Sequence, residues 1–245
     1  MNNTAIIIPS RLGAERFPNK PLAKINNVPM IIHVFNKAKE SKVGEVYVAT
    51  PDYEIFKIIN ENGGKAILTK KNHASGSDRI HEAYTKEIKN KVDLIINLQG
   101  DMPNIDPSAI LKLENFMRNN KCDIGTLASN IIDKKEIVDP NIVKVITDQK
   151  LEHNNFLNVK DFFRIKNDLN NEKIYHHIGI YAYTNKALTK YVKLARSKLE
   201  KERNLEQMRA MENSFSVKIG LCNSSPLGVD TEEDLIKVTK EMKKL

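Results

Sequence analysis

The chain has 245 residues and a formal net charge of +8, with 40% hydrophobic and 29% charged residues. This length suits one α/β domain with a sizeable core, and the proportions are ordinary for a soluble globular enzyme. No apolar run is long enough to span a bilayer, and the N-terminus has no basic stretch followed by a long apolar one. We therefore expect a cytoplasmic protein without membrane insertion.

The basic charge raises the question whether the partner is a nucleic acid. Aromatic residues make up only 6% of the chain and tryptophan is absent, so aromatic stacking platforms interleaved with basic residues are not visible. A basic balance also suits an enzyme that takes anionic substrates, and a coding bias toward lysine accounts for it equally well. We expect no nucleic-acid partner. Cys122 and Cys222 are isolated and fit no metal spacing, which is typical of buried free thiols.

Strand and helix signals alternate in the first half of the chain. Short β-branched runs predict strands, and apolar residues three or four positions apart predict helices. The predicted strands are residues 5–9, 45–50, 65–69 and 93–98, and the predicted helices open at Pro29 or cover residues 52–61, 77–88 and 107–118. Such alternation predicts a mainly parallel sheet with right-handed crossovers.

The second half is less regular. It contains predicted strands at 124–128, 143–147, 177–183 and 216–221, and predicted helices at 185–196 and 199–212. A last helix opens at Thr231, with Asp234 three residues later as in a capping box. Residues 154–171 show no clear period. Since no repeat or linker interrupts the chain, residues 1–245 are expected to form a single domain.

A cationic loop follows the first predicted strand. Residues 10–22 contain Arg11, Arg16 and Lys20 together with one glycine and two prolines. Backbone N–H groups of such a loop can form an anion-binding nest, which guanidinium groups and a lysine close around phosphate oxygens. Neither the Walker pattern nor the dinucleotide fingerprint occurs. The alternative is a solvated, positively charged surface loop.

The segment from Asn97 to Pro103 ends a buried-strand pattern with a glycine, a carboxylate and a proline. In an open α/β sheet, ligands bind outside the carboxyl ends of the strands. Asp101 is therefore placed where a nucleotide-bound metal ion is expected. The alternative is that Asp101 only caps the next helix.

Short motifs continue along almost the whole chain. They are Ile8-Pro-Ser-Arg11, Arg16-Phe-Pro-Asn-Lys20-Pro-Leu, His73-Ala-Ser-Gly-Ser-Asp-Arg79, Asn97-Leu-Gln-Gly-Asp101, Asp139-Pro-Asn-Ile-Val-Lys144, His177-Ile-Gly-Ile-Tyr181, Leu205-Glu-Gln-Met-Arg209 and Gly228-Val-Asp230-Thr. In this order and spacing, the motifs resemble those of the nucleotidyltransferases that activate sugars. Within that superfamily, the chain resembles the CMP-Kdo synthetases (3-deoxy-manno-octulosonate cytidylyltransferases).

The resemblance implies a three-layer α/β/α sandwich with a mainly parallel, mixed, Rossmann-like sheet of the nucleotide-diphospho-sugar transferase type. It implies an Mg²⁺-dependent enzyme that joins CTP to a sugar acid, Kdo or a related 2-keto-3-deoxy acid, and releases pyrophosphate for lipopolysaccharide or capsule assembly. It also implies a homodimer, in which a region at about residues 130–185 supplies the sugar pocket and the dimer contact.

The resemblance assigns roles to residues of the nucleotide half of the site. Lys20, Arg11 and Asp101 would be catalytic, and Asp101 and Asp230 would bind Mg²⁺. The nucleotide-binding set would be Arg11, Arg16, Lys20, Ser75, Gly76, Arg79 and Gln99. Two alternatives stay open: Asp230 and the segment 73–79 each also suit the capped start of a helix.

For the sugar acid, the matching positions are Gln99, His177, Tyr181, Glu206 and Gln207. A single histidine in a strand is more often a satisfied core residue than a ligand, and adjacent His176 and His177 cannot face the same side. The motif His-x-Gly-x-Tyr favours His177 as the inward residue.

The chain departs from the family pattern in several places. Asn19 replaces a glycine, and Asn is the residue that best tolerates a glycine-like backbone; Ala14 replaces a serine and Met102 a glutamate. Residues 154–165 lack the Ser-Arg-x-x-Ile-Pro segment whose arginine would meet the sugar carboxylate, so Arg164 or Lys160 substitutes or the acceptor is a different acid. Other acceptors are a nonulosonic acid or a phosphonate. A CTP-binding protein without catalysis is a further alternative.

Overall fold

The computed structural model describes residues 3–13, 16–165, 173–223 and 225–243. The chain divides into two compact units, which are Met1–Leu111 with Pro226–Leu245, and Lys112–Ser225. Within the described residues, no helix is long and apolar enough to cross a membrane. The prediction of one domain with a sugar-pocket region at about 130–185 stays a prediction, and the two units are described in turn.

The first unit contains a parallel sheet. Its strands lie in the order β5 (Lys65–Leu68), β4 (Glu45–Thr50), β1 (Thr4–Pro9) and β6 (Leu94–Asn97). Every neighbouring pair is parallel, with Ile7 opposite both Tyr47 and Asn97. The run of isoleucines in β1 is fully buried, as expected of a strand covered on both faces. Because the strands are parallel, β1 and β6 present their carboxyl ends, with the motifs that follow them, at the same edge.

The helices of the first unit begin close to their predicted positions. They are α1 (Met30–Glu40), α2 (Tyr53–Glu61), α3 (Gly76–Ala83) and α9 (Glu232–Glu241), with the 3₁₀ turn η1 (Lys20–Leu22) and the hairpin strands β2 (Lys24–Ile25) and β3 (Val28–Pro29). The predicted helix at 77–88 is α-helical only to Ala83 and continues as the π-helical turn η2 (Tyr84–Ile88).

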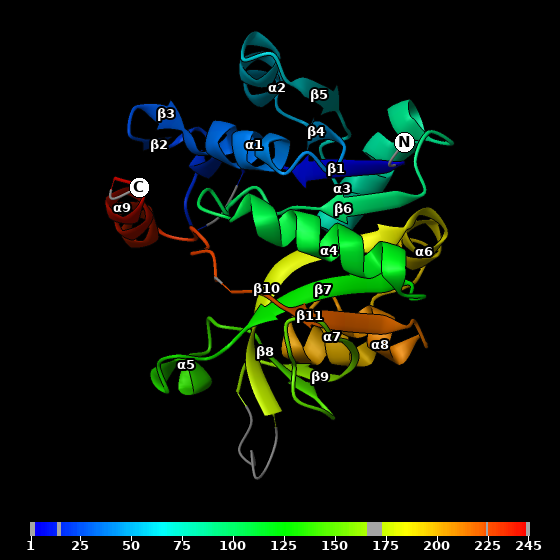
Figure 1. Cartoon of the computed structure of the whole chain (residues 1–245). Coiled ribbons are helices and arrows are strands. Elements are labelled where there is room, and N and C mark those ends of the chain that lie inside the picture. Colours follow the sequence, from blue (N-terminus) through cyan, green and yellow to red (C-terminus); the bar gives the residue numbers. More distant parts are fainter. Residues whose placement is uncertain (1–2, 14–15, 166–172, 224, 244–245) are drawn as a thin grey trace. The chain divides into compact units, whose positions relative to one another are not determined.

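The C-terminal segment of the chain returns to the N-terminal loop. Figure 1 shows α9 (red) beside the β2–β3 hairpin, and α9 contacts β2. The contact has its own apolar core, in which Phe17, Ile25 and Met30 pack with Val229 and Val238. Since Val229 is part of this core, the neighbouring Asp230 is held next to the cationic loop.

The second unit contains strands of mixed direction. They are β7 (Ile124–Ser129), β8 (Lys144–Thr147), β9 (Phe156–Phe163), β10 (Lys173–Thr184) and β11 (Val217–Leu221). Strand β11 is parallel to β7, whereas β10 is antiparallel to β7 and β8, and β9 is antiparallel to β8 and β11. The predicted α/β class with a mainly parallel, mixed sheet is confirmed.

Strand β9 was not predicted, because the segment shows no regular alternation of apolar and polar residues. Its burial pattern is irregular, and a register shift interrupts its pairing with β8 between Ile146 and Thr147. Pairing on both sides, with β8 and β11, stabilises β9. Tertiary hydrogen bonding therefore determines this strand, and periodicity does not reveal it.

The helices of the second unit are short. Helix α4 (Pro107–Asn119) crosses the boundary between the units, and α5 (Lys135–Val138), α6 (Asn185–Tyr191), α7 (Lys198–Arg203) and α8 (Met208–Glu212) follow. The predicted helices at 185–196 and 199–212 were therefore too long. Asn204 adopts a left-handed conformation (φ 51°, ψ 47°), which ends α7. A buried bidentate ion pair between Glu200 and Arg209 joins α7 to α8.

Candidate active site

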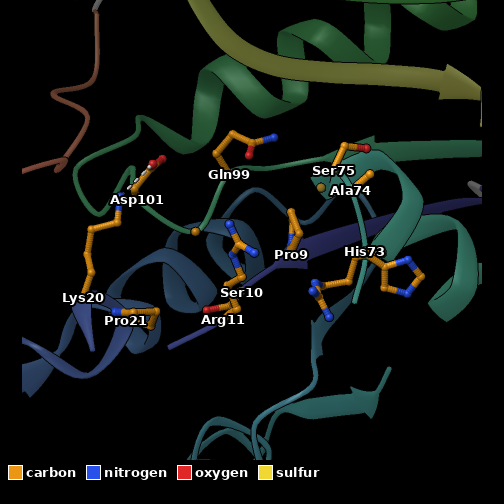
Figure 2. Close-up of a pocket in the computed structure, with 13 residues that line it drawn as sticks. Pro9, Ser10, Arg11, Lys20, Pro21, His73, Ala74, Ser75, Gln99 and Asp101 are labelled. Carbon is orange, nitrogen blue, oxygen red and sulfur yellow. Dashed lines mark hydrogen bonds and ion pairs between the residues drawn. The ribbon is translucent and has the colours of Figure 1, made fainter. Parts of the chain in front are cut away.

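A pocket of about 300 Å³ lies in the first unit, at the carboxyl ends of β1 and β6 and at the start of α3. Most of the predicted nucleotide-binding residues line it. The lining residues are Pro9, Ser10, Arg11, Lys20, Pro21, His73, Ala74, Ser75, Gly76, Arg79, Gln99, Gly100 and Asp101 (Figure 2). The predicted strand-end site is thus a real concavity, in the position where open α/β sheets bind ligands.

Two guanidinium groups serve this pocket. Arg79 is only 3% exposed, and its Nη1 donates hydrogen bonds to Thr69 Oγ1 (2.6 Å) and to the carbonyl oxygen of Lys70 (3.0 Å). Burial lowers the pKa of Arg79, and the positive charge of Arg11 lowers it further. Two cations that repel each other beside a pocket would both be stabilised by an anion within it.

Ser75 and Gly76 form the wall at the start of α3. The Ser75 hydroxyl accepts a hydrogen bond from the Asp78 N–H (3.2 Å) and donates one to the Asp78 carboxylate (3.0 Å), so Ser75 is the N-cap of α3. The helix-cap alternative is therefore confirmed for Ser75, which lines the pocket as well. A Cβ at Gly76 would lie 3.3 Å from Pro9 Cγ, so the glycine permits the close approach of helix and strand.

Glu82 supports the same wall and was not among the predicted site residues. Its carboxylate accepts the Lys70 N–H (2.9 Å), forms an ion pair with Lys86 and contacts His73 Nε2. Burial alone would raise the pKa of Glu82, but hydrogen bonds from Lys86, the Lys70 N–H and His73 lower it to about 2. Glu82 and Arg79 thus tie the segment 69–73 to α3. The sequence signal was a carboxylate one helical turn beyond Arg79.

Gln99 and Gly100 follow β6. Gln99 Nε2 donates to Asn97 Oδ1 (3.0 Å), which leaves Gln99 Oε1 as an acceptor, 3.8 Å from a Cβ built at Gly76. A Cβ at Gly100 would lie 3.0 Å from the carbonyl oxygen of Pro9, which is a tight contact, so the glycine permits the close approach of the ends of β1 and β6. The Gln-Gly pair therefore has both a polar and a steric role in the pocket.

Lys20, Asp101 and Asp230 come together although they are far apart in the chain. Lys20 Nζ lies 3.2 Å from Asp101 Oδ2, 3.2 Å from Asp230 Oδ1 and 2.6 Å from the carbonyl oxygen of Val229. Arg16 Nη2 contacts the other carboxylate oxygen of Asp230 at 3.0 Å. Arg16 is exposed and does not line the pocket. Three of the four predicted catalytic and metal-binding residues, Lys20, Asp101 and Asp230, therefore form one ion-pair cluster, and Arg11 lines the pocket beside it.

Other residues take the capping roles considered for the two aspartates. Asp106 Oδ1 accepts the Ser108 N–H at the start of α4, and Thr231 with Asp234 forms the capping box of α9. Asp101 and Asp230 are thus not the caps of these helices. Asn19 has φ 57° and ψ 17°, so the asparagine does adopt the glycine-like backbone. Met102 is buried, whereas Ala14 lies outside the described residues.

The second unit contains the other predicted acceptor residues. His177 is 6% exposed, and its Nε2 lies 2.9 Å from the Thr126 hydroxyl oxygen. That hydroxyl has a single proton, which it donates to the Ile180 carbonyl (2.7 Å), so His177 Nε2 carries a proton and donates. Burial and then the charge of His176 lower the pKa of His177 to about 3. His177 is therefore a neutral imidazole whose Nδ1 is an acceptor.

Aromatic rings surround His177. The Tyr181 and Phe162 ring centroids lie 5.5 and 5.0 Å from that of His177. Burial raises the pKa of Tyr181 well above its usual value, so its phenol stays protonated. His176 bonds Glu136 through Nδ1 (2.7 Å), and this different partner agrees with the prediction that the two histidines face opposite sides. His177 is both a satisfied core histidine and a residue of the predicted acceptor set.

Glu206 and Gln207 lie between α7 and α8. The backbone carbonyl of Glu206 accepts a hydrogen bond from the Tyr191 hydroxyl (2.7 Å), and Gln207 is the N-cap residue of α8 without a side-chain cap. Gln99 belongs to the first unit, whereas the other four predicted acceptor residues belong to the second. Their roles in binding an acceptor stay predictions.

The two candidates for the missing arginine differ in their contacts. Lys160 pairs with Asp148 at 4.0 Å and is exposed. Arg164 Nη1 donates to the carbonyl oxygens of Pro140 and Asn141, both at 3.0 Å, and no carboxylate pairs with it in the described part of the chain. His176 of β10 lies opposite Lys144 of β8, and Lys144 lies opposite Phe163 of β9. Because both pairings are antiparallel, the next residue of β10, His177, is level with the residue that follows β9, Arg164.

Comparison with known proteins agrees with this architecture. A cytidylyltransferase family model matches residues 5–219. The 3-deoxy-manno-octulosonate cytidylyltransferase of Brucella ovis is 42% identical over 233 residues, which cover 95% of this chain and 92% of that protein. The protein of the same name from Bartonella henselae is 42% identical over 236 residues, which cover 96% of both chains.

Solved structures give the same result. The structure of CMP:2-keto-3-deoxy-manno-octonic acid synthetase complexed with CTP matches with a TM-score of 0.89 at 34% identity and covers 99% of both chains. UTP-bound UGPase from Acinetobacter baumannii matches with a TM-score of 0.72 over 99% of this chain and 93% of that one, and its 11% identity shows the fold alone. The resemblance stated from the motifs is confirmed, and the chain belongs to the cytidylyltransferase family of nucleotidyltransferases.

Proposed function

We propose that this enzyme transfers CMP from CTP to 3-deoxy-manno-octulosonate (Kdo) or a closely related 2-keto-3-deoxy sugar acid, and releases pyrophosphate. The observation that carries the proposal is the convergence of Lys20, Asp101 and Asp230 beside a pocket served by Arg11 and Arg79. The names of the 42% identical relatives support Kdo as the acceptor. The product would feed lipopolysaccharide or capsule assembly.

The reaction needs positioning and charge stabilisation. A hydroxyl oxygen of the acid loses its proton to solvent and attacks the α-phosphorus of CTP, so that a new O–P bond forms. The bond from the α-phosphorus to the bridging oxygen breaks, and pyrophosphate leaves with that oxygen. Arg11 and Lys20 line the pocket and would hold the phosphate oxygens on which negative charge accumulates. Arg16 would reach the same phosphates from the exposed side of the cluster.

Mg²⁺ fits the cluster. Asp101 and Asp230 direct one carboxylate oxygen each at a single point, which Lys20 Nζ marks. Hard carboxylate oxygens are suitable ligands for Mg²⁺, and phosphate oxygens and water would complete its coordination. No group of three or more metal-ligating side chains occurs among the described residues, which suits an ion that arrives with a nucleotide. When bound, Mg²⁺ would neutralise charge on the phosphate oxygens.

The Gln99 amide supports cytosine as the base. Its Nε2 is already engaged with Asn97 Oδ1, so Oε1 is available as an acceptor in the pocket. Cytosine carries a donor amino group at the position where uracil carries an acceptor carbonyl. An acceptor held in this orientation therefore favours CTP over UTP.

The second unit supports an anionic acceptor and a homodimer. Arg164, which has no carboxylate partner in the described part of the chain, would meet the acid, and His177 Nδ1 would accept a hydrogen bond from a sugar hydroxyl.

Three large hydrophobic residues of the predicted dimer region are exposed, namely Ile132 (93%), Val138 (70%) and Ile165 (53%). Light scattering with gel filtration should give twice the chain mass, and Ile132→Asp should lower it to one chain. A wild-type mass of one chain would contradict the proposed homodimer.

The proposal is tested by pyrophosphate release with CTP and Mg²⁺, first with Kdo and then with other sugar acids, nonulosonic acids and phosphonates. Turnover with Kdo is expected. If only another acid supports turnover, the proposed CMP transfer stands and that acid is the acceptor. If no acceptor supports pyrophosphate release although CTP binds, the protein would instead be a CTP-binding protein that lacks catalysis.

A further inference from the structure

The Lys20 ammonium occupies the point where the two proposed metal ligands converge. Figure 2 shows Lys20 reaching from η1 toward Asp101, which follows β6, and the dashed line between them is one of three short contacts of this group. All three partners are oxygen atoms: one from Asp101, one from Asp230 and the Val229 carbonyl. This is an oxygen cage of the kind that a hard cation also takes.

The fold brings the carboxylates together regardless of any metal. The Val229 N–H donates to the Asp101 carbonyl oxygen (2.9 Å), and the buried Val229 side chain is part of the apolar core around Phe17. Two carboxylates held this close repel each other unless a cation lies between them. Arg16 contacts only the outer oxygen of Asp230, so the Lys20 ammonium is the cation that both carboxylates share.

We propose that Lys20 is an exchangeable occupant of the divalent-cation site: its ammonium neutralises Asp101 and Asp230 in the nucleotide-free enzyme and moves to the triphosphate when the metal ion enters. The inference rests on the metal role assigned under the proposed function. Mg²⁺ binds oxygens at about 2.1 Å, so Mg²⁺ and the Lys20 ammonium cannot both occupy the point between the Asp101 and Asp230 carboxylates. The side chain can make this exchange because an ammonium on a four-carbon stem rotates freely between partners.

The exchange couples the two ligands. Without nucleotide, a metal ion must displace Lys20 from both carboxylates, so metal binding alone is weak. A triphosphate offers the displaced ammonium new oxygen partners, so nucleotide and metal each strengthen the binding of the other. Lys20 would thus keep the site from filling with a divalent cation before CTP arrives.

The test measures Mn²⁺ binding to the nucleotide-free enzyme by electron paramagnetic resonance of the free ion. Lys20→Met removes the competing charge and is expected to tighten Mn²⁺ binding by about tenfold relative to wild type. A tenfold change in affinity is about the contribution of the two partly exposed ion pairs that Lys20 makes with Asp101 and Asp230. Lys24→Met is the matched control, because Lys24 is exposed and lies only four residues away. This control should leave Mn²⁺ binding unchanged. Adding Asp101→Asn to Lys20→Met should abolish the gain.

Unchanged or weaker Mn²⁺ binding by Lys20→Met, in protein with a wild-type melting curve, would overturn the inference. A gain that survives Asp101→Asn would also overturn it, because the ion would then bind elsewhere. The readout does not depend on turnover. If wild type fails to release pyrophosphate with any acid but Lys20→Met still gains Mn²⁺ affinity, the proposed reaction fails and the cation exchange stands.

Discussion

The two units of this chain position their polar residues in different ways. In the first unit, the polar residues follow parallel strands directly, as Ser10 and Arg11 follow β1 and Gln99 and Asp101 follow β6. In the second, His177 lies inside the antiparallel strand β10 and is held by Thr126 of β7. Groups at strand ends form a site through short, contiguous motifs, whereas groups inside a sheet depend on register and packing.

The difference has a consequence for specificity. The first unit presents cations and carboxylates, which suit the phosphate chemistry shared by all nucleotidyltransferases. The second unit presents a neutral imidazole, a protonated phenol and a guanidinium without a carboxylate partner in the described part of the chain. Substitutions of the charged cluster in the first unit should therefore affect turnover itself, and those of the polar residues in the second should affect the choice of acceptor.

The largest expected effect concerns the carboxylate cluster. Asp101→Asn should lower the turnover number on the order of 10³-fold, because the cluster loses one of the two carboxylate charges that would bind the proposed metal ion. Pyrophosphate release at saturating CTP and Kdo measures this change. The melting temperature should stay near that of wild type, since Asp101 is not the N-cap of α4. Near-normal turnover would contradict the proposed role of Asp101 as a metal ligand.

A substitution in the second unit should separate the acceptor from the nucleotide. Arg164→Gln should raise the KM for the sugar acid roughly tenfold or more and leave the KM for CTP unchanged, because a charge-assisted hydrogen bond to the carboxylate is lost. Lys160→Gln is the matched control and should leave both constants unchanged, because Lys160 already pairs with Asp148. Equal effects on the two substrates would contradict the division of roles.

The wall of the proposed nucleotide pocket should show a stability contribution that depends on pH. The pKa of Glu82 is lowered to about 2 in the folded state from 4.5, so its stabilisation is present above pH 4.5 and is lost as the pH falls toward 2. Glu82→Gln should therefore lower the free energy of unfolding at pH 7 by ~3 kcal/mol. Urea denaturation at pH 7 and at pH 3 measures the difference in the free energy of unfolding between wild type and Glu82→Gln, and this difference should be smaller at pH 3. A difference that does not change with pH would mean that the substitution acts through packing.

The smallest expected effect concerns base selection. Asn97→Ala removes the acceptor that orients the Gln99 amide, so Gln99 can rotate and present its donor to uracil. The ratio of kcat/KM for CTP over UTP should fall by about tenfold, the scale of one hydrogen bond. Competition between the two nucleotides measures the ratio, and an unchanged ratio would mean that another group reads the base.

The sequence predicted the parts of the fold that depend on local pattern. The four strands of the parallel sheet and the start of α9 at Thr231 agree with the structure to within a residue or two, whereas the short hairpin strands β2 and β3 were not predicted. Strand β9 and the break at Asn204 were missed, because the strand depends on partners far along the chain and the break on one left-handed residue. Glu82 was missed because a carboxylate one helical turn beyond Arg79 is a weak signal, shared by many charged residues on the surfaces of helices.

The motifs by themselves determined the family, the class of fold and the residue types of the phosphate site, since these are short segments whose chemistry needs contiguous residues. The tertiary structure decided how those residues are used. The Lys20 ammonium meets the carboxylates of Asp101 and Asp230 only because the segment before α9 returns to the N-terminal loop and packs there through Val229. In the chain, Lys20 is 81 positions from Asp101 and 210 positions from Asp230. Their close approach depends on burial and packing across the whole unit, which no local pattern contains.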